Sequence, residues 1–185
     1  MKIHLASLKD YTADNKAATD YLNSLLGEIV ESEIYSDTGN IAFDSIINFK
    51  LKNAKEDNIK LDLSMSIPLD LGVEVTDIVT ILGNLLDNAL EAVAKVNEKI
   101  IKLDIAFHQG ALFAKIDNSF DGKLTYTEEK PGEERQIASR KSGNDHGYGL
   151  KNIRRSLEKY NGYMKISHTD TIFSAGVFLY VENSP

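Results

Sequence analysis

The sequence contains no cysteine, and this absence excludes several kinds of chemistry. Disulfide bonds, thiolate catalysis and cysteine-ligated zinc are ruled out, and the composition suits a reducing compartment. The chain also lacks a run of 18 apolar residues and a signal-peptide pattern, so we expect it to be soluble as it stands. Because 21 Lys and Arg stand against 28 Asp and Glu, the net charge of −7 disfavours binding to nucleic acid.

The motifs of two large classes of nucleotide-binding enzymes are also missing. No Gly-x-x-x-x-Gly-Lys-Ser/Thr loop is present, and neither His-Arg-Asp nor Asp-Phe-Gly occurs. The sequence therefore supports neither a P-loop enzyme nor a protein-kinase fold. With 42% hydrophobic residues over 185 positions, the chain is long enough for one full core and a small appendage.

The hydrophobic pattern divides the chain into a helical N-terminal segment and a main domain. Helical patterns over residues 4–11 and 17–34 predict a helical hairpin. A turn-rich stretch, Ser36-Asp37-Thr38-Gly39-Asn40, follows, in which Asp37 or Asn40 is suited to cap the next helix. We therefore predict a partial helical hairpin over residues 1–35 and one domain over residues 40–185.

Helical and strand patterns then alternate through the main domain. We predict helices over residues 43–54, 78–93 and 150–160, and strands over residues 59–67, 100–107, 111–116, 163–168 and 173–181. Residues 119–146 lose all periodicity, which is typical of a functional lid or a disordered insert. This order predicts an α+β fold, a two-layer α/β sandwich with helices on one face of a mixed sheet.

The helix predicted over residues 78–93 carries two amides beside its apolar face. Asn84 and Asn88 are four residues apart, so their side chains lie on one side of the helix. Burying them without partners would cost a few kcal/mol, and we therefore expect a polar group to meet them. The apolar neighbours Leu85 and Leu86 favour this interpretation over two ordinary surface residues.

Other residues supply what a nucleotide requires, namely an acceptor for the adenine amino group, oxygen ligands for Mg²⁺ and donors for phosphates. Asn88 offers Mg²⁺ a hard oxygen ligand, and Asp117 and Asn118, at the end of an apolar strand, offer adenine an acceptor. Gly147 and Gly149 allow close backbone approach just before a helix N-terminus, which favours phosphate. The remaining nucleotide-binding candidates are Arg140, Lys141, His146, Tyr148 and Leu150.

These motifs resemble those of the GHKL family of ATP-binding domains, and most closely those of sensor histidine kinases of the quorum-sensing, accessory-gene-regulator kind. The run from Asn84 to Ala92 resembles the family's N box, and His146-Gly-Tyr-Gly-Leu-Lys-Asn152 resembles its second glycine box. Ile116-Asp117-Asn118-Ser119 resembles a reduced first glycine box, since Ser119 and Asp121 stand where the family has glycines. The resemblance spans residues 40–181 and implies the Bergerat ATPase fold. It puts Asp117 on the adenine-binding position, with Asn118 as the neighbouring alternative.

The resemblance implies an ATP- and Mg²⁺-dependent protein-histidine kinase of a two-component system. ATP would give its γ-phosphate to a histidine, and a response regulator would then receive it. Ile3-His4-Leu5 resembles an element that follows the acceptor histidine, so we expect the acceptor upstream of Met1, assign no catalytic residue here and expect no autophosphorylation of this chain. The apolar face of residues 1–35 predicts a homodimer through a four-helix bundle. The resemblance also implies that this is the cytoplasmic portion of a membrane-anchored sensor.

Two other functions stay open. The first is an ATP-hydrolysing conformational switch of the same fold. Gyrase-like and chaperone ATPases resemble this family but carry a carboxylate near the Asn84 end of the N box, where Asn cannot act as a base. The second is a non-catalytic signalling module that binds partners through its hairpin. Steady-state hydrolysis tests the first alternative, and titration with Mg²⁺ and ATP tests the second.

Overall fold

The computed structural model describes residues 33–126, 137–138 and 149–181. The chain divides into two units, residues 1–34 and residues 35–185, and the second unit holds the sheet and helices described below. The predicted helical hairpin lies outside the described residues, except for its last positions. Five of the predicted site residues also lie outside them: Arg140, Lys141, His146, Gly147 and Tyr148.

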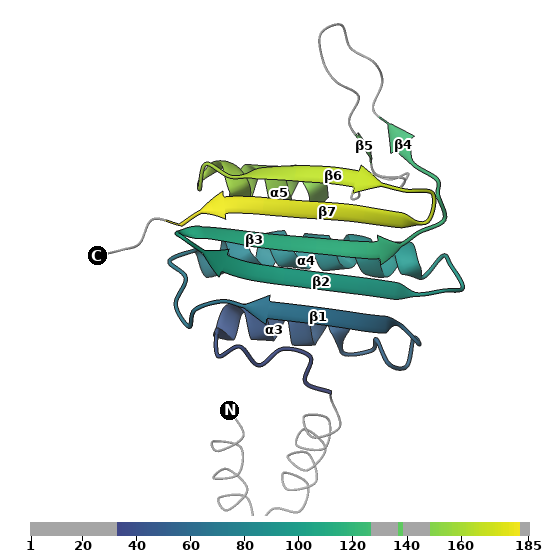
Figure 1. Ribbon diagram of the computed structural model, residues 1–185, viewed down its shortest axis with the longest axis horizontal. Coiled ribbons are helices and arrows are strands. Elements are labelled where there is room, and N and C mark those ends of the chain that lie inside the picture. The colour runs from purple at the N-terminus through teal and green to yellow at the C-terminus, as the bar shows by residue number, and fades with distance from the viewer. Residues whose placement is uncertain (1–32, 127–136, 139–148, 182–185) are drawn as a thin grey trace, which may run out of the picture. The chain divides into compact units, whose positions relative to one another are not determined.

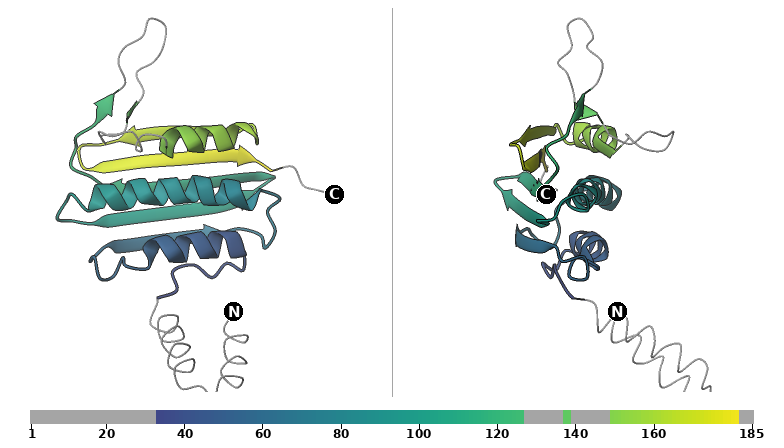
Figure 2. Two further views of the ribbon diagram at one scale, coloured as in Figure 1. Left: turned by 180° about the vertical axis from the view of Figure 1, so that it is seen from behind. Right: turned by 90° about the vertical axis from the view of Figure 1, so that its right-hand side faces the viewer.

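The second unit is built on a five-stranded mixed sheet in the order β1-β2-β3-β7-β6 (Figure 1). Its strands are β1 (Lys60–Ser66), β2 (Ile100–His108), β3 (Ala111–Ser119), β6 (Tyr163–His168) and β7 (Ile172–Tyr180). Strand β1 pairs with β2 in parallel, and every other pair in this sheet is antiparallel. Helices α3 (Ile41–Leu51), α4 (Val75–Val93) and α5 (Gly149–Glu158) cover one face of it (Figure 2). The predicted two-layer sandwich is confirmed.

The core lies between the helices and this face of the sheet. Helix α4 is the central element, and its residues Leu85 and Leu86 are almost completely buried. Strands β2 and β3 send alternate residues toward the helices, among them Leu103 and Ile116, because successive strand side chains point to opposite faces. Each fully buried side chain of this size contributes about 1.5–3 kcal/mol.

Two turns have the backbone geometry that their residues predict. Gln109 and Gly110 join β2 to β3 with φ of 51° and 76°, the positive pair of a tight hairpin. Asn161 follows α5 with φ of 49°, and the Gly162 N–H donates to the Leu157 carbonyl at 2.9 Å, which closes the helix end. Asn40 caps α3, as one of the two predicted candidates.

The region predicted to lack periodicity starts later and contains more structure than expected. Strand β3 continues to Ser119, and a short ribbon forms where β4 (Thr125–Tyr126) pairs with β5 (Ile137–Ala138). The apolar pattern stops before β3 does, because the last residues of the strand are polar. Two-residue strands are too short to produce any periodicity. None of the helices in the described ranges is long and apolar enough to cross a membrane.

Candidate functional site

Helix α4 places the two predicted amides on one side, one turn apart. Asn84 is half-buried and Asn88 is exposed. The Asn84 Nδ2 donates to the Thr80 carbonyl at 2.6 Å, and the Thr80 hydroxyl in turn donates to the Thr76 carbonyl at 2.7 Å. This local bonding occupies the amide nitrogen of Asn84 and fixes the direction of its carbonyl oxygen.

The carbonyl oxygen of Asn84 lies against Gly149, the first residue of α5. A Cβ atom placed on Gly149 would stand 2.9 Å from Asn84 Oδ1, which is closer than side-chain atoms normally approach. Helices α4 and α5 pack together along their length. The structure therefore brings together Asn84 and Gly149, which belong to two motifs that lie far apart in the sequence.

The start of α5 is suited to an anion. The first N–H groups of a helix have no partners within the helix, and the helix dipole makes this end positive. No acidic residue occupies the first turn of α5. Leu150, the second residue, is half-buried and packs against the core, which fixes the helix end in place.

Asp117, the predicted adenine contact, lies on the sheet face opposite the helices. Its Oδ1 accepts a hydrogen bond from the Ser174 hydroxyl, which stands directly across on β7. Its Oδ2 accepts from Lys115 Nζ at 2.7 Å. The carboxylate is thus engaged by neighbours on that face and is turned away from Asn84 and Gly149.

Asn118, the alternative, lies on the helix-covered side and is only 2% exposed. Its Nδ2 donates to the Ser119 carbonyl at 3.0 Å, so its side-chain carbonyl oxygen keeps its capacity as an acceptor. Counting from Asn118, the second glycine of Asp-x-Gly-x-Gly falls on Gly122. Gly122 has φ of +71°, and an added Cβ would stand 2.8 Å from the Asp170 carbonyl oxygen. The geometry therefore favours Asn118 over Asp117.

The sequence carries both alternatives. Aspartate, with which the family pattern begins, stands at position 117, whereas Asn118 stands four residues before Gly122. Alternation along a strand shows that Asp117 and Asn118 point to opposite faces. Asn118 shares its face with Leu112 and Ile116, whose apolar side chains mark the buried face.

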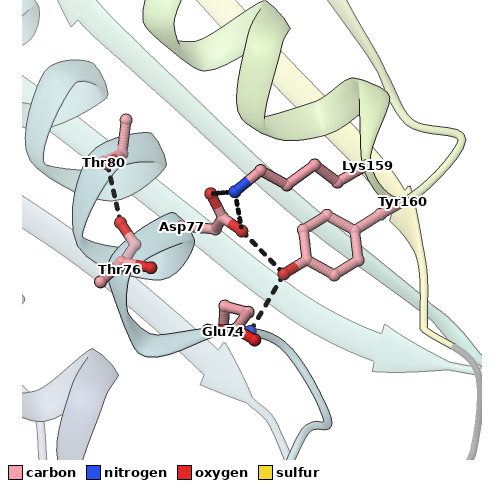
Figure 3. Close-up of polar contacts among 6 residues, drawn as sticks. All are labelled: Glu74, Thr76, Asp77, Thr80, Lys159 and Tyr160. Carbon is pink, nitrogen blue, oxygen red and sulfur yellow. Dashed lines mark hydrogen bonds and ion pairs between the residues drawn. The ribbon is translucent and has the colours of Figure 1, made fainter.

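A buried polar cluster joins the start of α4 to the end of α5 (Figure 3). Asp77, 3% exposed, accepts from Lys159 Nζ at 2.9 and 3.0 Å and from the Tyr160 hydroxyl at 2.8 Å. The Tyr160 oxygen also accepts from the Glu74 N–H at 3.0 Å. Burial by itself would raise the pKa of Asp77, but hydrogen bonds from Lys159, Tyr160 and Ser156 outweigh it and lower the pKa.

The Asp77 cluster fixes α5 at the end opposite Gly149. Asp77 holds the C-terminal end of α5, and Asn84 contacts its first residue, so α4 and α5 run antiparallel. Nothing in the motifs pointed to this cluster, although the position of Asp77 beside the apolar residue Ile78 in the first turn of α4 was a weak signal. Burial raises the pKa of the Tyr160 hydroxyl, which therefore stays a proton donor to Asp77.

Across the three described ranges, no three His, Asp or Glu side chains gather into a metal site. A cation bound next to Asn88 on α4 would therefore need oxygen ligands other than a cluster of carboxylates. The Asn88 side-chain carbonyl is an oxygen group of that kind, and its amide makes no hydrogen bond to any other described residue and is open to solvent.

Comparison with known proteins points in one direction. The model of the GHKL domain family matches residues 73–179, which include α4, β3 and α5. The sensor protein CitS of Bacillus subtilis (strain 168) is 29% identical over 139 residues. This alignment covers 69% of the present chain and 23% of CitS, so the chain spans less than a quarter of that relative's length.

The fold is similar to those of histidine kinase catalytic domains. The catalytic domain of ThkA in a nucleotide-free form has a TM-score of 0.57 at 16% identity, covering 78% of this chain and 93% of that one. The mycobacterial kinase MprB has a TM-score of 0.52 at 13% identity, with 75% and 93% covered. The kinase domain of the Escherichia coli osmosensor EnvZ has a TM-score of 0.52 at 14% identity, with 79% and 88% covered. At these identities the likeness shows the fold.

Proposed function

Because this chain belongs to the GHKL domain family, we propose that its main unit is the ATP-binding catalytic region of a sensor histidine kinase. The approach of Gly149 to Asn84 carries the proposal, because it joins the N box to the second glycine box at one site. The similarity to CitS, a sensor protein, and to the fold of histidine kinase catalytic domains supports it.

In this proposal, different residues bind the adenine, the phosphates and the metal ion. The side-chain carbonyl oxygen of Asn118, rather than Asp117, accepts a hydrogen bond from the adenine amino group. The free N–H groups at Gly149 and Leu150 bind phosphate oxygens. Asn88 supplies an oxygen ligand to Mg²⁺, which neutralises phosphate charge when bound. Exposure of Asn88 suits an ion that takes most of its ligands from phosphates and water.

The reaction proposed is transfer of the γ-phosphate of ATP to a histidine. The bond from the γ-phosphorus to the bridging oxygen breaks, ADP leaves, and an imidazole nitrogen takes the phosphoryl group. Positioning and charge neutralisation supply most of the rate enhancement in such transfers. Asn84 cannot activate water as a base, so the site should hold ATP with little hydrolysis.

The surrounding system is part of the same proposal. The acceptor histidine upstream of Met1, the response regulator, the homodimer and the membrane-bound cytoplasmic setting rest on resemblance to sensor kinases. The contributions of Arg140, Lys141, His146, Gly147 and Tyr148 stay predictions, as does the narrower likeness to quorum-sensing kinases.

Calorimetric titration of this chain with ATP, with and without Mg²⁺, tests the proposal directly. We expect binding that Mg²⁺ strengthens. In Asn88→Ala, affinity should fall about tenfold with Mg²⁺ and change little without it, because only the metal ligand is lost. Asn97→Ala, which truncates an exposed asparagine in the turn after α4, is the matched control.

Two results would contradict the proposal. Absence of binding at millimolar ATP favours the non-catalytic signalling module. Rapid steady-state hydrolysis by the isolated chain favours the ATP-hydrolysing switch, because a kinase site without a base at Asn84 should turn over slowly.

A further inference from the structure

The segment that enters the second unit is held by Asn48, a residue of α3. The Asn48 Oδ1 accepts from the backbone N–H groups of Tyr35 at 2.7 Å and Ser36 at 2.9 Å. Its Nδ2 donates to the Ser36 carbonyl at 2.8 Å. One side-chain amide thus satisfies three backbone groups of the entering chain, as a neighbouring strand would.

Asp44, one turn earlier on the same helix, holds the next residues of this segment. Its Oδ1 accepts from the Ser36 hydroxyl at 2.6 Å, and from the Thr38 hydroxyl and N–H at 2.9 and 3.0 Å. Its Oδ2 accepts from the Gly39 N–H at 3.0 Å. Burial would raise the pKa of Asp44, but these hydrogen bonds lower it, so the carboxylate is charged at neutral pH.

The far end of the segment is equally fixed. Asn40 caps α3, and its Nδ2 donates to the carbonyls of Pro68 at 3.3 Å and Leu69 at 3.0 Å. Gly39 has φ of +84°, and an added Cβ would stand 2.5 Å from Leu69 Cδ2, so a residue with a side chain would be strained there. Residues Tyr35–Asn40, which we call the junction, therefore belong to the rigid body of the second unit.

A short path of contacts connects the junction to the nucleotide site. Helix α3, which carries Asp44 and Asn48, packs against α4, and Lys50 pairs with Asp87 at 2.6 Å across the two helices. Asp87 directly precedes Asn88 in α4. The direction in which the chain enters the second unit is thus fixed relative to the residues that would hold ATP and Mg²⁺.

We propose that Asp44 and Asn48 are positioning residues for phosphoryl transfer. They fix the course of the junction on the second unit, and with it the direction in which the chain that leads toward the phosphoacceptor leaves this unit. A loose junction would add orientations that are unproductive, and the rate depends steeply on orientation. The inference rests on the proposed kinase function and adds to it a role for two residues that contact neither nucleotide nor acceptor.

The test uses the full-length kinase that contains this chain and compares Asn48→Ala with wild type. Amide exchange of Tyr35 and Ser36 should accelerate about tenfold, because their N–H groups lose the Asn48 acceptor. The maximal autophosphorylation rate should fall about tenfold while the KM for ATP stays within about twofold, because the nucleotide site is untouched. Asn53→Ala, which truncates an exposed asparagine just after α3, is the control and should match wild type in all three measurements.

Asp44→Asn is the second variant in case Asn48→Ala does not fold, since it keeps the size of the side chain but removes its charge and replaces one acceptor oxygen by a donor group. The same separation of rate from KM is expected. An unchanged maximal rate in a variant whose junction exchanges faster overturns the positioning role, and so does an unchanged exchange rate. Wild-type protein that neither binds ATP nor phosphorylates itself would instead overturn the kinase function, so the two failures can be told apart.

Discussion

Replacement of Gly149 by alanine should separate nucleotide binding from fold stability. The new methyl group would stand 2.9 Å from Asn84 Oδ1, and the amide must turn away because it is the mobile end of a side chain. Turning it breaks the 2.6 Å hydrogen bond to the Thr80 carbonyl, a loss of about 1 kcal/mol. Alanine in place of glycine in a helix returns up to about 1 kcal/mol. The free energy of unfolding should therefore change by less than about 1 kcal/mol.

The affinity for ATP with Mg²⁺ should fall in this variant by about tenfold or more. The methyl group covers the phosphate-facing start of α5, and the displaced Asn84 amide enters the same space. Loss of a single hydrogen bond to a charged group costs about 1.5–3 kcal/mol, which corresponds to at least a tenfold weaker affinity. Urea denaturation and calorimetric titration of the same protein sample measure the two quantities.

Gly162→Ala is the matched comparison, because its added Cβ meets backbone rather than a side-chain end. It would stand 2.5 Å from the Phe178 carbonyl oxygen and 3.1 Å from that of Leu157. The backbone cannot turn away, so about 2–3 kcal/mol of stability should be lost. ATP affinity of the protein that stays folded should be unchanged. Wild-type affinity in Gly149→Ala would refute the reasoning, since Gly149 could then not lie at the phosphates.

Four further substitutions test three separate parts of the structure. Asp77→Asn should lower the free energy of unfolding by about 2–3 kcal/mol at neutral pH, measured by urea denaturation. Folding lowers the pKa of Asp77, so the extra stability of the wild type over this variant is fully present above the unfolded pKa of about 3.9 and is lost as pH falls through the lower folded pKa. A stability difference that grows as pH falls would exclude the charged Asp77 as its cause. Asn118→Ala should weaken ATP binding about tenfold, whereas Asp117→Ala should change it less than about twofold, and calorimetry giving the reverse order would restore Asp117. Lys50→Ala should lower the free energy of unfolding by no more than about 1 kcal/mol in thermal or urea denaturation, because its partner Asp87 is half exposed. A larger loss would contradict the assignment of this ion pair as a weak surface contact between α3 and α4.

Local sequence determined most of the elements of this protein. Helix α4 follows from apolar spacing near 3.6, and the β2–β3 hairpin follows from alternation and the turn at Gln109-Gly110. Capping of α3 by Asn40 and the turn at Asn161 that follows α5 are equally local, because they depend on residues within one turn. The cost of burying an amide predicted a polar group at both Asn84 and Asn88. Asn84 donates to the Thr80 carbonyl of its own helix, whereas Asn88 is exposed, so a polar partner for Asn88 stays a prediction.

Only the tertiary structure decided what depends on two segments meeting. The hydrogen bond between Asp117 and Ser174 required knowing that β3 lies beside β7. The contacts of Asp77 with Tyr160, and of Asp44 with Ser36 and Thr38, required knowing which surfaces pack together. The periodicity of apolar residues shows which face of its own helix or strand a residue occupies. It does not show which residue of another element will contact it. The site arises where β3, α4 and α5 come together, and packing alone sets that meeting point.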